Sequence, residues 1–171
     1  QGAIKHTSVL TIAGAQMTND IAIGLRTPNA EAEKIKHSFG CAYSPIISEG
    51  DNIEVPSVGG RESRTVPRQI LSEIIEARTR EMFELLDHDI NESGYREIIS
   101  SGIVLTGGAA SMQGMSELAE DVFQSPVRVG IPMGLGGLID VVNNPMYATC
   151  TGLIQYGSKR VKTGPVRELQ G

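Results

Sequence analysis

The chain has 171 residues, of which 40% are hydrophobic and 20% are charged, and these are the proportions of a folded globular protein rather than a disordered one. Its net charge of −5 argues against a non-specific nucleic-acid binder, because such proteins neutralise phosphates with a basic face. No run approaches the ~18 apolar residues of a membrane-spanning helix. Cys41 and Cys150 lie far apart and match no zinc motif, so we expect a protein of the reducing cytoplasm without a metal site.

The first 25 residues predict short elements. Residues 3–7 and 9–12 have the pattern of two β segments, which Gly14 ends. Thr18 is then expected to cap a short apolar helix.

A second predicted helix has clearer boundaries. Thr27 stands at its N-cap, Pro28 at its first helical position and Gly40 just after its end. From residue 41 to residue 65 the pattern changes to short strands separated by glycines.

The longest predicted helix runs from Pro67 to about Ile90 and carries one apolar stripe. The stripe is interrupted near its middle, where Arg78 and Thr79 occupy positions that the helical period assigns to apolar side chains. An arginine at such a position needs a partner or a function.

Strands and helices alternate through the C-terminal part of the chain. The sequence predicts strands over 102–106 and 126–129, a helix over 115–123 and a last helix from Asn144 to Tyr156. Alternation at both ends of the chain, with a mixed middle, is typical of an α/β fold with an insertion.

The segment VLTGGAASMQGMSEL gives the clearest indication of a ligand site. A buried-type strand ends in it, Gly107 and Gly108 turn the chain, and a helix begins a few residues later. Glycines permit close backbone approach, and a helix N-terminus offers free N–H groups to a ligand. The loop carries no lysine or arginine, which favours a base or a sugar over a phosphate. A plain tight turn between strand and helix explains the same spacing.

Glu33 and Lys36 lie on one side of the second predicted helix, three residues apart. They form either a solvated ion pair of a few tenths of a kcal/mol or a pair that reaches a ligand hydroxyl or ring. The residues alone favour the ion pair.

Arginines are concentrated just before, at the start of and in the middle of the longest predicted helix, namely Arg64, Arg68, Arg78 and Arg80. Arginine beside apolar residues is typical of an interface anchor, and an acidic partner would suit this set. The alternative is a solvated helix whose arginines are balanced by nearby glutamates.

Four segments occur in an order that is similar to a known family: IAGAQMTNDIA, AEKIKHSFGCA, VLTGGAASMQG and NNPMYATCTGL. Together they resemble the second domain of the actin/Hsp70-type ATPases, and within these the FtsA family of bacterial cell-division proteins. The similarity extends from about Gln1 to Tyr156. It implies an α/β fold with an actin-like (ribonuclease H-like) core subdomain and an inserted small α/β subdomain.

The resemblance divides the chain into three parts. Residues 1–15 and 96–157 would form the core subdomain (IIA), residues 16–95 the inserted subdomain (IIB), and residues 158–171 a flexible, linker-like tail. The family's first domain and its phosphate loops have no counterpart here, so we expect a fragment without ATPase activity. The expected cofactor, ATP with Mg²⁺, belongs to the intact protein, and the fragment should bind it weakly or not at all.

The resemblance also implies the residues of the adenosine half of a nucleotide site. Two glycines and an alanine match the family's adenosine loop, and a methionine after them matches the position against the adenine. An E-x-x-K pair matches the helix that closes over ribose and base, and an earlier glycine matches one near the phosphates. In this sequence the matching residues are Gly107, Gly108, Ala109, Met112, Glu33, Lys36 and Gly14.

The partners that the resemblance implies are those of a cytoplasmic adaptor at the inner face of the cell membrane. The inserted subdomain would dock the C-terminal tail of the division protein FtsZ through the four arginines, and the intact protein would self-assemble. Membrane contact would come from a C-terminal helix that is absent here. The alternative is the half-domain of a nucleotide-dependent enzyme of the same superfamily, such as a sugar or acetate kinase.

Overall fold

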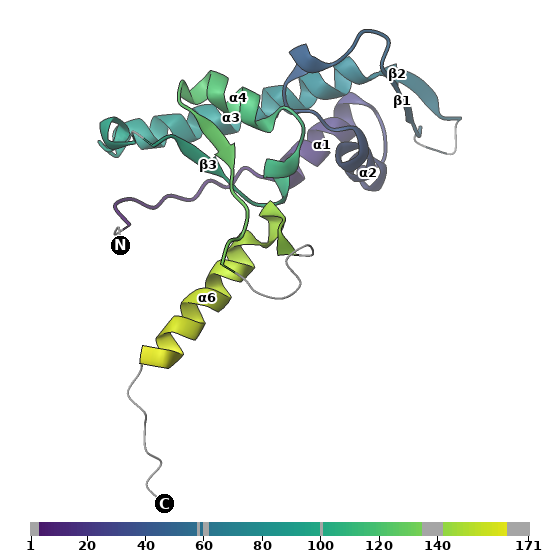
Figure 1. The fold of residues 1–171 in the computed structure, drawn as a ribbon. Coiled ribbons are helices and arrows are strands. Elements are labelled where there is room, and N and C mark those ends of the chain that lie inside the picture. The colour runs from purple at the N-terminus through teal and green to yellow at the C-terminus, as the bar shows by residue number, and fades with distance from the viewer. Residues whose placement is uncertain (1–3, 58, 60–61, 100, 135–141, 164–171) are drawn as a thin grey trace, which may run out of the picture.

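The computed structural model describes residues 4–57, 59, 62–99, 101–134 and 142–163 (Figure 1). Its main elements are α1 (Gly14–Gly24), α2 (Asn29–Phe39), β1 (Asn52–Val55), β2 (Arg64–Pro67), α3 (Arg68–Glu92), β3 (Ile103–Leu105), α4 (Met115–Phe123), β4 (Val127–Val129) and α6 (Ala148–Thr163). Within the described residues, β1 pairs antiparallel with β2, and β3 pairs parallel with β4. This mixture of helices and strands agrees with the predicted α/β class.

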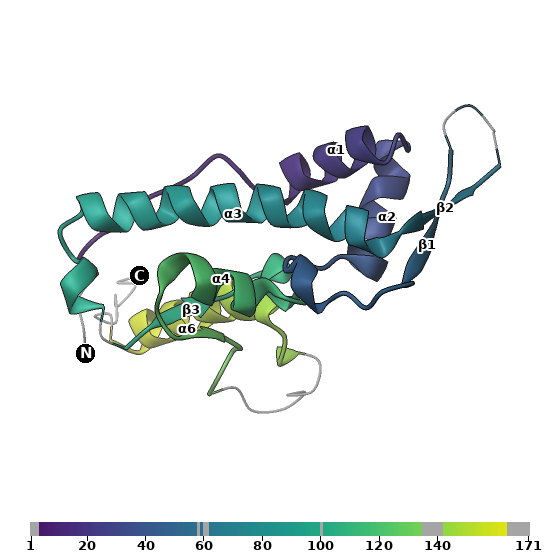
Figure 2. The same ribbon diagram turned by 90° about the horizontal axis from the view of Figure 1, so that it is seen from above.

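Helix α3 lies at the centre and the other elements pack around it. Helix α1 lies against the N-terminal half of α3 and α2 packs against α1, whereas α4 and the β3–β4 pair lie on another side of α3 (Figures 1 and 2). The β1–β2 hairpin extends from the end at which α3 begins, and α6 projects away from this body (Figure 1). The arrangement places the end of α2 and the loop after β3 near the start of α3.

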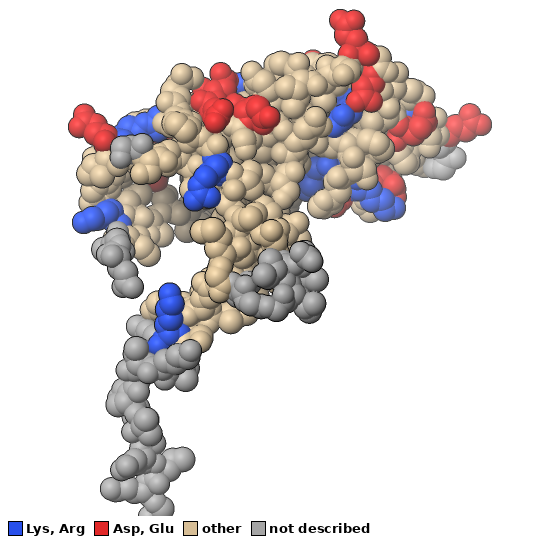
Figure 3. Space-filling model, viewed as in Figure 1, with Lys and Arg blue, Asp and Glu red and all other residues tan. Residues whose placement is uncertain are grey.

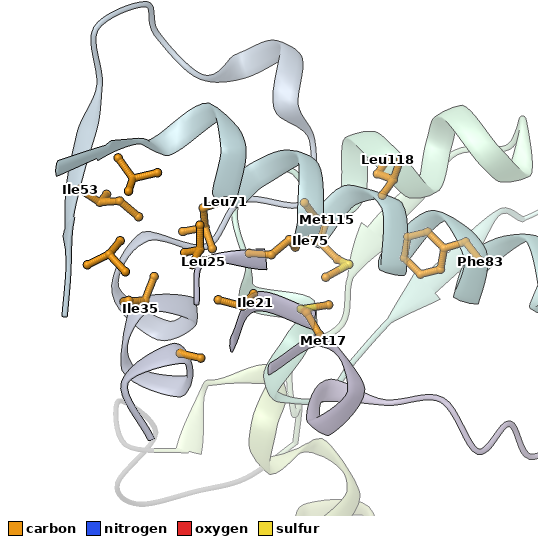
Figure 4. Close-up of a cluster of buried hydrophobic side chains, with 14 of the residues drawn as sticks. Met17, Ile21, Leu25, Ile35, Ile53, Leu71, Ile75, Phe83, Met115 and Leu118 are labelled. Atoms are coloured by element: carbon orange, nitrogen blue, oxygen red, sulfur yellow. The ribbon is translucent and has the colours of Figure 1, made fainter. Parts of the chain in front are cut away.

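Buried apolar side chains from both sides of α3 form one cluster, shown in Figure 4. Its members include Met17, Ile21, Leu25, Ile35, Ile53, Leu71, Ile75, Phe83, Met115 and Leu118. At the far end of the cluster the rings of Phe83 and Phe123 pack with their centroids 5.4 Å apart. The core is therefore continuous across the predicted boundary between residues 95 and 96.

The interruption in the apolar stripe of α3 has a physical explanation. Thr79 is fully buried, and its hydroxyl donates to the carbonyl of Ile75 at 2.8 Å, so the helix itself satisfies the polar group. Arg78 turns to α1, where it forms an ion pair with Asp20.

Two predictions at the N-terminal end are wrong. Residues 4–13 form no strand, because no neighbouring strand lies beside them to exchange backbone hydrogen bonds, and residue 3 lies outside the described residues. Helix α1 begins at Gly14, so Thr18 lies inside the helix and is not its cap. The Thr18 hydroxyl instead lies 2.9 Å from the Gly14 carbonyl, one helical turn earlier.

The boundaries of the second helix are nearly as predicted. Gly40 is its C-cap, as predicted, but the N-cap is Pro28 rather than Thr27, whose hydroxyl donates to the carbonyl of Pro56 at 2.7 Å. The strand predicted just after this helix is wrong, because residues 44–46 form a 3₁₀ turn with Pro45 in it.

The C-terminal elements confirm the sequence pattern, with one difference. The predicted strands and the helix over 115–123 correspond to β3, β4 and α4. Helix α6 continues to Thr163, beyond the predicted start of the tail at residue 158, since the next proline in the sequence is Pro165. The rest of the predicted tail, 164–171, lies outside the described residues.

Candidate functional site

A cavity of about 580 Å³ lies where the start of α1, the last turns of α2, the start of α3 and the loop between β3 and α4 meet. Five of the seven residues that the sequence implies for a nucleotide site line it: Gly14, Lys36, Gly108, Ala109 and Met112. Glu33 stands behind Lys36 on the same helix, and Gly107 precedes the lining loop. A volume of this size is in the range that small ligands occupy.

The backbone of the β3–α4 loop needs glycine at two positions. Gly107 has φ +96° and caps a 3₁₀ turn over Gly108–Ser111, and its N–H donates to the Pro145 carbonyl at 3.0 Å. Gly114 has φ +76°, and a Cβ there would lie 2.7 Å from the backbone nitrogen of Tyr43. These two glycines allow the loop to turn tightly in front of the cavity.

The ammonium group of Lys36 is held by the protein rather than left free for a ligand. It donates to Glu33 Oε2 at 2.7 Å, to Thr18 Oγ1 at 2.7 Å and to the Gly14 carbonyl at 3.2 Å. The three donors of the ammonium therefore all have acceptors, and Lys36 ties α2 to the first turn of α1.

The carboxylate of Glu33 is the polar acceptor next to the cavity. The hydrogen bond from Lys36, followed by that from Thr18, holds the pKa of Glu33 below its ordinary value. His37 Nε2 lies 3.0 Å from the other oxygen, Glu33 Oε1. An ionised carboxylate of this kind can accept hydrogen bonds from ligand hydroxyls but cannot donate one.

The apolar part of the cavity wall comes from two methionines and an alanine. Met17 is buried in α1 and Met112 is partly buried, and Ala109 and Met112 both lie on the loop between β3 and α4. Thioether and methyl groups suit contact with a flat apolar ring system. The wall thus offers an apolar surface for a ring.

The four arginines predicted to bind a partner do not form one basic surface. Arg64 donates to the Leu25 carbonyl, and Arg68 lines the cavity just described. Arg78 pairs with Asp20 and Glu81, and Arg80 pairs with Glu76 and Asp121. On the face that Figure 3 shows, Lys and Arg are interspersed with Asp and Glu.

Arg78 does line a second hollow. A groove of about 330 Å³ is formed by the first two turns of α1, through Ala15, Gln16, Asn19 and Asp20, together with Arg78 from α3. The Asp20 carboxylate raises the pKa of Arg78, so the guanidinium stays charged at the edge of this groove.

Sequence reasoning missed the residues that hold these sites in place. Thr18 was predicted as a cap, Arg68 as a partner contact, and Asp20 and Gln113 were given no role. Their contacts join residues 15 to 58 positions apart, and no local pattern could have indicated such pairs.

None of the described helices is both long and apolar enough to cross a bilayer. Within the same residues, no three or more His, Cys, Asp or Glu side chains gather where they could hold a metal ion.

Comparison with known proteins identifies a family. Residues 1–152 match the family described as "Cell division protein FtsA". The chain is 47% identical to "Cell division protein FtsA" of Pseudomonas aeruginosa over 171 residues, which is 100% of the chain and 41% of the relative. It is 41% identical to the protein of the same name from Escherichia coli K12, with 92% of the chain and 39% of the relative covered.

A solved structure shares the fold. The crystal structure of MreB 5 of Spiroplasma citri bound to AMPPNP matches with a TM-score of 0.68 and 15% sequence identity, over 90% of this chain and 46% of that one. MreB is actin-like, so the likeness supports the predicted actin-like fold. The chain spans about two fifths of the length of the curated relatives it matches.

Proposed function

The chain belongs to the FtsA family of cell-division proteins, and from this premise we propose that the cavity between α2 and the β3–α4 loop binds the adenosine half of ATP. The observation that carries the proposal is the convergence of five residues, from three separate parts of the sequence, on one cavity. An ATP analogue, AMPPNP, is bound by a solved protein of the same fold.

Four lining residues, together with Glu33 behind Lys36, have a part in this binding. Met17 and Met112 contact the base, and Glu33 accepts hydrogen bonds from the ribose hydroxyls. Lys36 positions that carboxylate, and Gly108 lets the backbone approach the nucleoside closely.

In the intact protein the ligand would be ATP with Mg²⁺. The negative charge of the ATP phosphates would be bound by the phosphate loops of that protein. The residues described here fit the adenosine part through the size of the cavity and its apolar wall. The chain by itself should bind the nucleotide weakly at best and should not hydrolyse it.

Saturation-transfer NMR on residues 1–171 tests the proposal with adenosine as the probe. Because the chain offers only half of a nucleotide site, adenosine should bind with a Kd in the millimolar range, which corresponds to a binding free energy on the order of −4 kcal/mol. Adenosine should show saturation transfer at the H2 and H8 protons, and ADP should compete with it. If adenosine shows no transfer at ~10 mM with the folded chain, the cavity is not an adenosine site.

The second proposed function is docking of the C-terminal tail of FtsZ at the groove between α1 and α3. Support comes from the charged edge that Arg78 gives to this groove and from the family itself. An apolar peptide with acidic residues would lie in the groove and bring a carboxylate to the guanidinium.

Fluorescence anisotropy of a labelled FtsZ tail peptide, titrated with the chain at two salt concentrations, tests this docking. Saturable binding at ~1–100 μM that weakens with salt supports a charged contact. No binding to the folded chain would place the docking site elsewhere in the protein.

The family name gives a role in cell division, and for the intact protein we propose the adaptor role that the resemblance in the sequence implies. It would link FtsZ to the inner face of the cytoplasmic membrane through a C-terminal helix and self-assemble with its own copies. The kinase-like alternative loses its support, because the chain matches a family of cell-division proteins over residues 1–152.

A further inference from the structure

Arg68 joins three segments at one end of the cavity. Its Nε donates to the carbonyl of Phe39 at 2.8 Å, its Nη1 to Asp51 Oδ2 at 3.0 Å and its Nη2 to Gln113 Oε1 at 2.7 Å. Each nitrogen of the guanidinium is thereby held by an acceptor, which fixes the plane of the group.

This contact determines which way the amide of Gln113 faces. A guanidinium has donors and no acceptor, so the amide oxygen must point to Arg68 and the amide nitrogen must point away from it. Within the described residues, no acceptor pairs with that nitrogen. Gln113 is exposed and lines the cavity, so its amide nitrogen, with two N–H donors left over, is available to a ligand at this end.

The backbone of Gln113 is fixed as well. Its carbonyl accepts a hydrogen bond from the Ala42 N–H at 2.8 Å, and Cys41 forms an isolated parallel bridge with it. The backbone hydrogen bond therefore fixes the Cα end of the Gln113 side chain, and the hydrogen bond from Arg68 fixes its amide end. A donor held at both ends loses little rotamer freedom when a ligand binds.

We infer that Gln113, oriented by Arg68, is a specificity-determining residue that donates a hydrogen bond to a ring nitrogen of a purine base in this cavity. The inference rests on the proposed adenosine site and adds the group that recognises the base. Purine rings carry acceptor nitrogens at their edges, and a site built to donate to one of them discriminates against an analogue that lacks it.

The variant Gln113→Glu separates recognition from structure. A glutamate keeps an oxygen for Arg68 and makes an ion pair with it, so the fold and its melting temperature should be kept or improved. The variant has no N–H donors, so adenosine should bind roughly three- to tenfold more weakly. A purely structural role for Gln113 predicts unchanged affinity in this variant.

A series of 1-, 3- and 7-deazaadenosine shows which ring nitrogen is recognised. One of the three analogues should bind the wild-type chain more weakly than adenosine does, by the same factor by which Gln113→Glu weakens adenosine binding. The affinity of that analogue should not fall further in the variant. The series needs only the wild-type chain, so it decides the question even where the variant is misfolded.

The outcomes distinguish this inference from the proposed function. If the wild-type chain does not bind adenosine, both fail. If it binds adenosine and all three analogues equally well, and Gln113→Glu binds like the wild type, the inference fails and the adenosine site stands.

Discussion

Lys36 Nζ lies 2.7 Å from Glu33 Oε2, and the two side chains differ in exposure, with 10% of the lysine and 44% of the glutamate accessible to solvent. The cation is thus the desolvated member of the pair. Its other acceptors, Thr18 Oγ1 and the Gly14 carbonyl, are neutral. Among the three acceptors of this nearly buried ammonium, Glu33 is thus the anionic one.

Glu33→Gln should lower the free energy of unfolding by about 1 kcal/mol, because it leaves a nearly buried ammonium without an anion. Urea unfolding at neutral pH measures the loss. The matched control is Glu31→Gln, which breaks another pair at three-residue spacing on α2, one whose lysine, Lys34, is 71% exposed. The control should cost about 0.3 kcal/mol. Equal losses in the two variants would show that the cavity wall does not need the charge of Glu33.

Acid should destabilise the fold through two glutamates. Lys36 holds the pKa of Glu33 below its ordinary value of 4.5. Burial acts to raise the pKa of Glu76, and hydrogen bonds from Ser44 and Arg80 outweigh it, so this pKa is lowered as well. Carboxyls with depressed folded-state pKa values give stability that is complete above the unfolded pKa and is lost as pH falls through the folded one.

The free energy of unfolding should therefore decline as the pH falls below 4.5. Urea unfolding at a series of pH values measures this decline, and Glu33→Gln should make it less steep. An identical slope in the variant would mean that Glu33 is not stabilised as a carboxylate.

Gly108→Val should abolish adenosine binding without unfolding the chain. A Cβ on Gly108 would meet nothing nearer than the Cβ of Met146 at 4.0 Å, so the valine has room, and its methyl groups occupy the cavity that Gly108 lines. Saturation-transfer NMR measures binding and circular dichroism checks the fold. Gly152→Val is the control, since Gly152 lies on α6 and does not line the cavity. Retained affinity in Gly108→Val would place the ligand elsewhere.

The family resemblance, rather than the local pattern, predicted most residues of this cavity. The residues alone favoured an ion pair between Glu33 and Lys36, which the structure contains, and Lys36 and the glycine turn after β3 both reach the cavity. The partner surface was less predictable. An arginine in an apolar stripe looks like an anchor in the sequence, whereas Arg78 already pairs with Asp20, which lies 58 residues earlier.

Arg78→Glu should weaken the binding of the FtsZ tail peptide at least tenfold and reduce its salt dependence, because the variant places a third carboxylate beside Asp20 and Glu81 at the edge of the groove. Anisotropy titrations at two salt concentrations measure both effects. Lys34→Glu makes the same charge change on α2, away from the groove, and should bind like the wild type. If both variants lose affinity equally, net charge rather than the groove governs binding.

Phe83→Ala tests whether the predicted inserted subdomain and the core subdomain unfold as one unit. Phe83 is buried on α3 and packs against Phe123 at the end of α4, so the substitution opens a cavity in the shared cluster and should cost about 3–5 kcal/mol. Leu85→Ala, at a side chain that is 40% exposed, should cost far less.

Amide hydrogen exchange distinguishes one cooperative unit from two. Because buried residues of α1, α3 and α4 belong to one cluster, the slowest amides of all three helices should lose protection by the same factor in Phe83→Ala. If α1 and α3 lose protection and α4 does not, the parts on the two sides of residue 95 unfold independently, and the cluster seen around α3 is an interface between two cores. Equal losses would instead tie the cavity beside Lys36 and the groove at Arg78 to a single folding unit centred on α3.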